Sequence, residues 1–205
     1  IEPWEPTSPL AFFCKWIADL NHKTIIHAGS LSKHGKGALI VGNGGAGKSG
    51  TVIGAMKHGF QSSGDDYTLL SKKANGYCAH AVFRTVKQDL AGLKRLNIPR
   101  PADLNWQNKA VFRPENVFQN GIVDSVAVHV LLFPSIGGVE TTFHAVDPVI
   151  VFKTLTMSTL KQLTGSYAPI FVTCAKLIHD LPCFGIKLSS NPKKFLQNWH
   201  YLWRI

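Results

Sequence analysis

The chain has 205 residues, of which 45% are hydrophobic and 17% charged. A chain of that size and composition fits one compact domain with a sizeable core, which excludes a disordered or fibrous protein. Its formal net charge of +10 favours anionic partners, and nucleotides and acidic peptides qualify as well as nucleic acids. The basic residues are scattered, without a basic arm, a zinc-finger motif or an RNA-recognition motif, so we expect no nucleic-acid partner.

Four cysteines lie far apart along the chain, at Cys14, Cys78, Cys174 and Cys183. Without a CxxC pair or a dense cysteine framework they indicate reduced thiols in a cytoplasmic protein. No signal peptide or membrane span is visible, because the most apolar stretch, residues 126–134, is short and interrupted by His129. The sequence begins at Ile1, so we expect a fragment that lacks an N-terminal part.

The first part of the chain predicts a helix, two strands and a second helix. Residues 10–20 have a helical pattern, and residues 24–32 and 38–41 flank a glycine- and lysine-rich turn, which is typical of a hairpin. A second helix is expected over residues 48–58, where Gly59 supplies the glycine that commonly follows a helix end.

The remainder of the chain predicts strands and two further helices. Strands are expected at residues 60–63, 67–70, 77–82, 125–133 and 141–146, while residues 87–120 are weakly patterned. Asp147-Pro148 is a good helix start, and Asn191-Pro192 repeats it before a last helix that ends at Arg204. This order predicts a single α/β domain over residues 1–205.

A glycine cluster after the second strand matches the phosphate-binding pattern G-x-x-x-x-G-K-[ST] in full. The predicted nucleotide-binding residues are Gly42, Asn43, Gly44, Gly45, Ala46, Gly47, Lys48, Ser49 and Gly50. The glycines let successive backbone N–H groups turn around a phosphate, and the following helix aims its positive end at the same anion. Lys48 is expected to reach the β- and γ-phosphates, and the Ser49 hydroxyl to bind Mg²⁺. An average chain of this length matches the pattern by chance about once in a hundred times or less.

Two adjacent carboxylates, Asp65 and Asp66, follow Ser49 by sixteen and seventeen residues. One carboxylate beside a phosphate loop can hold Mg²⁺, and the other can accept the proton of an attacking hydroxyl. Neighbours on an extended segment point to opposite sides, so the two can take different roles. A solvated Gly-Asp-Asp-Tyr turn is the alternative. His27, on a predicted strand before the loop, is a third candidate, with a packed bystander as its alternative.

These motifs together resemble the HPr serine kinase superfamily, which shares its P-loop core with phosphoenolpyruvate carboxykinase. The matching residues are His27-Ala28-Gly29, the phosphate loop, Lys57-His58-Gly59-Phe60 and Gly64-Asp65-Asp66. The resemblance implies a P-loop-containing mixed β-sheet with flanking helices, and ATP- and Mg²⁺-dependent phosphorylation of a serine. It implies Asp65 as the general base, Asp66 as a magnesium ligand, and His27 near the γ-phosphate. HPr kinases assemble, so it also implies a homo-oligomer.

The chain departs from HPr kinases in lacking any Glu-x-Arg sequence, so HPr itself is not the expected substrate. Residues 81–87, 158–163 and 181–184 instead resemble the smaller HPr-kinase-like proteins of lasso-peptide biosynthesis, which phosphorylate the C-terminal serine of a precursor peptide. By this resemblance Arg84 and Lys87 are candidates for contacting phosphate or a peptide carboxylate, with solvated basic residues as the alternative.

The leading hypothesis is therefore a serine kinase with a peptide or protein acceptor and no membrane partner. Two rivals stay open: a small-molecule kinase or carboxykinase-like enzyme, and a regulator that senses ATP without catalysis. The sequence has no signature that separates ATP from GTP.

Overall fold

The computed structural model describes residues 8–74, 76–100, 104–105, 107–119, 121–163, 165–189 and 199. The predicted last helix, from Asn191-Pro192 to Arg204, falls outside the described residues apart from position 199. The helices are α1 (Ala11–Leu20), α2 (Lys48–Lys57), α3 (Leu90–Leu96), α4 (Pro148–Gln162) and α5 (Ala168–Asp180), with one 3-10 turn, η1 (Pro114–Asn116). The strands are β1 (Thr24–His27), β2 (Gly29–Lys33), β3 (Lys36–Ile40), β4 (Tyr67–Lys73), β5 (Gly76–Ala81), β6 (Val86–Asp89), β7 (Lys109–Phe112), β8 (Ser125–Val128), β9 (Val130–Gly138), β10 (Thr142–Ala145) and β11 (Cys183–Ser189).

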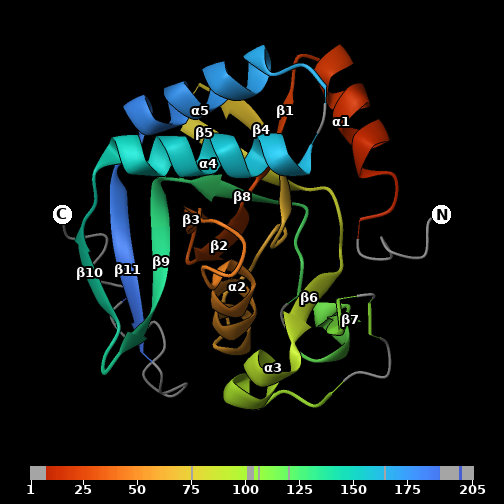
Figure 1. Cartoon of the computed structure of the whole chain (residues 1–205), viewed down its shortest axis with the longest axis vertical. Helices are drawn as coiled ribbons and strands as arrows, with labels where there is room; N and C mark the ends of the chain where they lie inside the picture. The colour runs from red at the N-terminus through yellow and green to blue at the C-terminus, as the bar shows by residue number, and fades with distance from the viewer. Residues whose placement is uncertain are drawn as a thin grey trace.

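The strands form two sheets and a two-stranded ribbon (Figure 1). The mixed sheet has the order β10-β11-β9-β3-β2, in which β11, β9 and β3 are parallel and the two edge strands are antiparallel. The antiparallel sheet has the order β1-β4-β5-β8, and β6 pairs with β7 in the ribbon. A mixed β-sheet with flanking helices is the α/β fold class that the sequence predicts, and it is confirmed.

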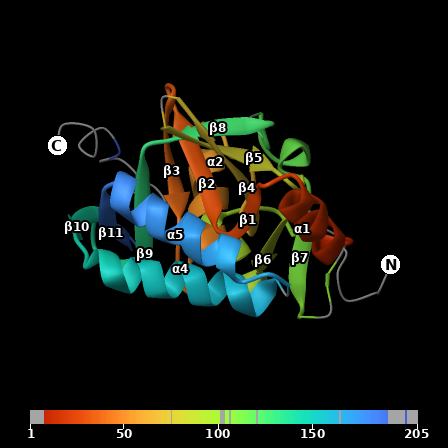
Figure 2. The same cartoon turned by 90° about the horizontal axis from the view of Figure 1, so that it is seen from above.

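Alternating side chains of β3 divide the core between the two faces of the mixed sheet. Ala38 and Ile40 pack with α2, whereas Leu39 packs with α4 and α5 on the other side. Figure 2 shows α4 and α5 lying side by side. Because β3 is buried on both faces, the loop at its carboxyl end is attached to a buried strand of the sheet.

Two predicted strands each prove to be a pair of strands in different sheets. Residues 24–32 divide at Ala28, where β1 joins the antiparallel sheet and β2 joins the mixed sheet. Residues 125–133 divide in the same way at His129. Hydrophobic periodicity predicts that a segment is extended, but it does not show where the chain passes from one sheet to the other.

Other segments differ in kind from the sequence prediction. Residues 60–63 form isolated bridges rather than a strand. The weakly patterned stretch at residues 87–120 contains β6, α3 and β7. Helix α5 was not predicted, and its first turn gives a reason, since its N-cap is Tyr167, whose side chain makes no capping hydrogen bond.

The start of α4 agrees with the sequence prediction and offers a simple stability test. The Asp147 carboxylate accepts a hydrogen bond from the Val149 N–H at 2.9 Å, and Pro148 occupies the first turn. We expect Asp147→Ala to lower the free energy of unfolding by about 1 kcal/mol, because the capping acceptor is lost. Urea unfolding monitored by circular dichroism measures this. Asp147→Ser, which retains a capping oxygen, should stay within a few tenths of a kcal/mol of the parent.

None of the helices in the described part of the chain is long and apolar enough to cross a bilayer. All four cysteines carry free thiols, which agrees with the reduced state expected from their spacing.

Candidate active site

The glycine-rich loop joins the end of β3 to the first residue of α2, in the strand–loop–helix context that the motif requires. Gly45 and Gly47 have φ angles of 82° and 98°, which side-chain-bearing residues rarely adopt. Gly47 is also the N-cap of α2, and a Cβ built there would come within 3.1 Å of the Ile136 side chain. The loop therefore presents backbone and the positive end of α2 to the space in front of it.

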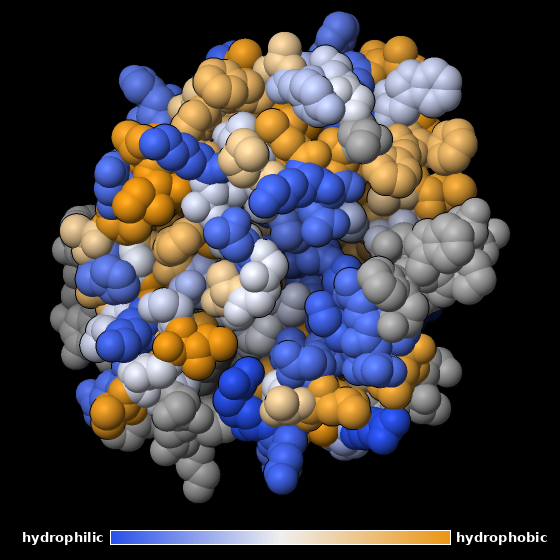
Figure 3. Space-filling model, in the orientation of Figure 1, coloured by the Kyte–Doolittle hydropathy of each residue, from blue (hydrophilic) through white to orange (hydrophobic). Residues whose placement is uncertain are grey.

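That space is a cavity of about 360 Å³, within the range of small-molecule sites. Its lining is mostly polar and comes from the phosphate loop and the start of α2, from β1, β6, α3, β9 and α4, and from the segments that lead into β4 and β7. The lining residues are His27, Gly44, Gly45, Gly47, Lys48, Ser49, Gly50, Asp66, Lys87, Gln88, Asp89, Arg95, Asn105, Gln107, Lys109, Ile136 and Gln162. Figure 3 shows hydrophilic residues gathered around the middle of this face. A polar, cation-rich cavity in front of a helix N-terminus suits a phosphorylated ligand.

Lys48 lies within the loop itself. Its ammonium group donates to the carbonyl of Gly42 at 2.9 Å and to that of Asn43 at 3.2 Å, and the residue is only 5% exposed. Burial lowers the pKa of Lys48, while Asp66 and Asp65 act in the opposite direction. An ammonium group held by loop carbonyls can exchange them for phosphate oxygens without leaving the cavity.

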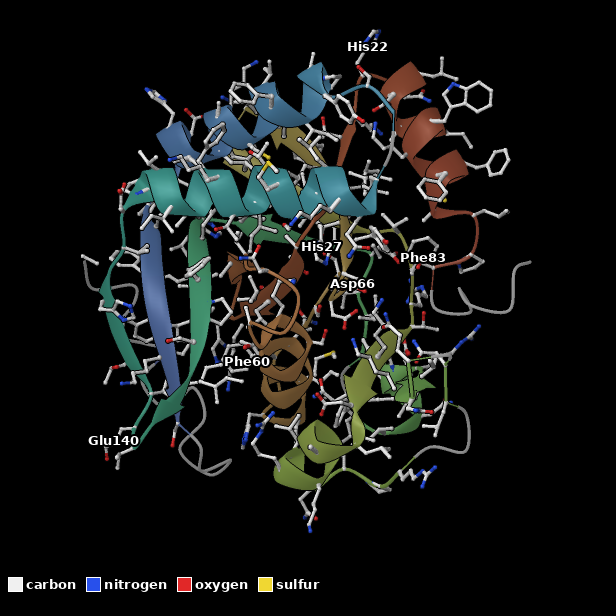
Figure 4. All side chains as sticks on the ribbon, viewed as in Figure 1. His22, His27, Phe60, Asp66, Phe83 and Glu140 are labelled. Atoms are coloured by element: carbon white, nitrogen blue, oxygen red, sulfur yellow. The ribbon has the colours of Figure 1, made fainter. Side chains whose placement is uncertain are left out.

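Asp66 carries the main ion pair of the cavity. Its Oδ2 is 2.6 Å from Lys87 Nζ, and its Oδ1 is 3.2 Å from His27 Nε2. Figure 4 shows His27 and Asp66 close together below α4. Burial alone would raise the pKa of Asp66, but the hydrogen bond from His27 and the charge of Lys87 outweigh it and hold the pKa well below its usual range.

The pKa values of His27 and Lys87 are both shifted by burial and by the neighbouring Asp66. Burial lowers the pKa of His27, so the ring is neutral at neutral pH and donates its Nε2–H to Asp66. His27 Nδ1 is then an acceptor, and it is buried without a partner among the described residues. Burial opposes the charge of Lys87, but the attraction of Asp66 prevails and raises the pKa of Lys87.

Asp65 is more deeply buried than Asp66, with 3% of its surface exposed. It accepts hydrogen bonds from the Ser49 hydroxyl and from the backbone N–H of Lys87. Its Oδ2 is buried and has no partner among the residues that the structure describes. Burial, with the negative charge of Asp66 as the second cause, raises the pKa of Asp65 to about 7. A carboxylate in this state is suited to exchange protons near neutral pH or to receive a cation.

A small hollow of about 10 Å³ lies beside the two carboxylates, lined by Ser8, Gly64, Asp65, Asp66, Tyr67, Phe83, Thr85 and Lys87. This volume is close to what one water molecule or one hydroxyl group needs. Asp66 and Lys87 line both the hollow and the cavity, whereas Asp65 lines the hollow alone. Asp66 therefore lies between the phosphate-loop cavity and this hollow.

Of the two basic residues predicted to contact substrate, only Lys87 lines the cavity. The Arg84 guanidinium instead bonds the carbonyl of Ile122 at 2.9 Å and the Asp124 carboxylate, and lies 3.7 Å from Glu115. We expect Arg84→Ala to cost about 0.5–1 kcal/mol of stability, because its side chain is half exposed and its ion pairs are screened. Nucleotide affinity, measured by calorimetry, should remain within about twofold of the parent, since no nucleotide contact is removed.

The wall that faces the phosphate loop was not predicted from the sequence. It contains Asp89, Arg95, Asn105 and Lys109, all from the segment around the β6–β7 ribbon. Asn105 Oδ1 accepts hydrogen bonds from the N–H groups of Gln107 and Lys109, which fixes the turn before β7. No local motif marks these residues, because pairing of β6 with β7 brings them to the cavity.

Comparison with known proteins finds likenesses among solved structures. A scan against models of protein families finds no match to the chain, and neither does a search of curated proteins. Among solved structures, the HPr(Ser) kinase/phosphatase from Coxiella burnetii is similar, with a TM-score of 0.41 and 15% sequence identity over 60% of this chain and 72% of that one. A likeness of this size carries no inference about chemistry.

Proposed function

We propose that the chain is an ATP- and Mg²⁺-dependent phosphotransferase that moves the γ-phosphoryl group to a hydroxyl of a peptide or protein. The observation that carries this proposal is the position of two dissimilar carboxylates beside a phosphate loop. Asp66 is held ionised by His27 and Lys87, whereas the pKa of Asp65 is raised to about 7. A pair of carboxylates with separated pKa values is what a metal ligand and a general base require.

The residues present fit a magnesium ion. The Ser49 hydroxyl lies at the start of α2, and the ionised Asp66 supplies carboxylate oxygens to the same cavity. The described residues hold no cluster of three or more His, Cys, Asp or Glu that would bind a metal unaided. Mg²⁺ needs only one or two carboxylates when substrate phosphates and water complete its shell. When bound, it neutralises charge on the β- and γ-phosphates.

The side chains divide the remaining tasks. Lys48 releases its loop carbonyls and binds the β- and γ-phosphates, and the N-terminus of α2 holds the same anion. Asp66, with Ser49, holds the metal. His27 and Lys87 keep Asp66 oriented, and Lys87 also lines the cavity, where it would be the candidate for a contact with the γ-phosphate.

Asp65 is the base for the acceptor hydroxyl, which enters through the small hollow beside it. The hydroxyl oxygen attacks the γ-phosphorus, the bond between that phosphorus and the bridging oxygen breaks, and ADP leaves with the electron pair. The hydroxyl proton passes to Asp65 Oδ2. Peptide acceptors are preferred because Phe83 and Lys87, which line the hollow, are partly exposed, so the hollow adjoins the protein surface.

A serine is the acceptor that the resemblance to HPr-kinase-like proteins favours, and the C-terminal serine of a lasso-peptide precursor is the narrowest form of the proposal. The departure from the Glu-x-Arg pattern argues against HPr. Small-molecule acceptors and a non-catalytic ATP sensor are the alternatives that an experiment must separate.

The test combines binding with transfer. Calorimetry should show ATP binding that is at least about tenfold tighter with Mg²⁺ than with EDTA. Incubation with γ-labelled ATP and a panel of serine peptides should then yield labelled peptide. Label that appears only on small metabolites would show that the acceptor is a small molecule rather than a peptide. ATP binding without any loss of the γ-phosphate would favour the non-catalytic ATP sensor. Absence of ATP binding would overturn the proposal altogether.

A further inference from the structure

Helix α1 exposes an unusual number of large apolar side chains. Ala11, Lys15 and Ala18 face the protein, where the helix packs against Ile25 and Leu163. The residues that point away from the protein form what we call the α1 stripe: Leu10, Phe12, Phe13, Trp16, Ile17 and Leu20, each between 55% and 68% exposed. Figure 4 shows side chains of α1 projecting outward on the side of the molecule opposite β10 and β11, and Figure 3 shows hydrophobic colour gathered there.

The α1 stripe is large enough to matter energetically. At these exposed fractions each side chain offers roughly 100 Å², so the stripe presents about 600 Å² of apolar surface. That is at the upper end of the largest patch on an ordinary monomer. It is also most of the roughly 800 Å² that one partner contributes to a stable protein–protein interface.

The pattern of the stripe fits a second copy of itself. Phe13, Trp16, Ile17 and Leu20 have the spacing i, i+3, i+4 and i+7, which gives one continuous seam along the helix. Two such seams pack antiparallel about a twofold axis, where each residue meets the same surface on the partner. The stripe contains no ionisable residue, so two copies, each with a net charge of +10, can meet there without like charges facing each other across the contact.

We propose that the α1 stripe is the interface of a twofold symmetric dimer of this chain. A membrane surface is a poorer fit, because helices that lie on a membrane carry Lys and Arg on their polar face. The one basic residue within α1, Lys15, is buried and bonds Asp19 at 2.5 Å. The proposal does not depend on the kinase assignment, since it uses no residue of the cavity.

Light scattering coupled to size-exclusion chromatography tests the dimer over protein concentrations from about 1 to 100 µM. The parent protein should approach about 45 kDa, twice the 22.5 kDa of one chain. Trp16→Glu should raise the dimer dissociation constant by roughly 100-fold or more, because a central aromatic residue is lost on both sides and a charge is introduced. Since Trp16 is exposed on the single chain, the circular dichroism spectrum should be unchanged, and at concentrations where the parent is also monomeric the two melting temperatures should agree.

Val139→Glu is the matched control, because Val139 is 84% exposed but lies outside the stripe, between β9 and β10. It should dimerise like the parent. A parent protein that stays monomeric at about 100 µM overturns the proposal, as does a Trp16→Glu variant that still dimerises. Monomeric parent protein that co-sediments with vesicles of neutral and anionic phospholipid would assign the stripe to a membrane and overturn it as well.

Discussion

Lys48→Met is expected to weaken MgATP binding by about 30- to 1,000-fold. The Lys48 ammonium group is held within the phosphate loop by its hydrogen bonds to the carbonyls of Gly42 and Asn43. Its removal leaves phosphate oxygens without charge-assisted hydrogen bonds worth about 2–4 kcal/mol together, which converts to that range of affinity. Methionine retains an unbranched side chain of similar length, so the packing of the loop should survive.

Isothermal titration calorimetry with a non-hydrolysable ATP analogue and Mg²⁺ measures the loss. Lys73→Ala is the control, since Lys73 is an exposed lysine at the end of β4, outside the cavity lining. It removes the same charge from the whole molecule, and its affinity should remain within about threefold of the parent. Equal losses of nucleotide affinity in both variants would show that the effect comes from net charge and that Lys48 does not bind the phosphates.

The second large effect is expected from Asp65→Asn, which should lower phosphotransfer by about 10²- to 10⁴-fold while ATP affinity stays within about threefold. Asparagine is nearly the same size, and its amide can still bond Ser49, but it cannot take a proton from the acceptor. Transfer to an acceptor peptide, or the slower transfer to water measured as phosphate release, reports the loss.

The same substitution should not destabilise the fold at pH 8. The pKa of Asp65 is raised in the folded protein, so ionisation costs folding free energy once the pH exceeds its unfolded value, and the cost is complete above about pH 7. A neutral asparagine removes that cost, so the melting temperature should be unchanged or higher.

Asp124→Asn is the matched control, because Asp124 is an exposed carboxylate bound by Arg84. It should retain full transfer. Full activity in Asp65→Asn together with loss in Asp66→Asn would exchange the roles proposed for the two carboxylates. Loss of ATP binding in Asp65→Asn would instead make Asp65 part of the nucleotide site.

The parts of the site that could be read from the sequence are those set by local chemistry. The phosphate loop is one contiguous motif, and the hydrophobic pattern after it predicts α2, whose first residue is Lys48. The pair Asp65-Asp66 was recognised from its distance to the loop. That the two carboxylates have different environments follows from contacts that sequence spacing does not encode, above all the pairing of Asp66 with His27 on β1 and Lys87 on β6.

The remaining wall of the cavity depends on long-range pairing. Ile136 comes from β9, which reaches the loop because it is parallel to β3. Gln162 comes from the end of α4, and Lys109 from a ribbon strand inside a weakly patterned stretch. Arg84 and Lys87 are only three residues apart, and both carry a positive charge. One is drawn to Asp124 and the other to Asp66, so position in the fold, rather than composition, separates them.

The most direct test of the central claim is mass spectrometry of a peptide ending in serine after incubation with the protein, ATP and Mg²⁺, beside the Asp65→Asn variant. We expect the mass increase of one phosphate on the serine with the parent protein, and none with the variant or with EDTA. An unmodified peptide while ATP remains bound would contradict transfer to a peptide hydroxyl and leave only the nucleotide site. Equal phosphorylation by the variant would contradict the role of Asp65 as the base.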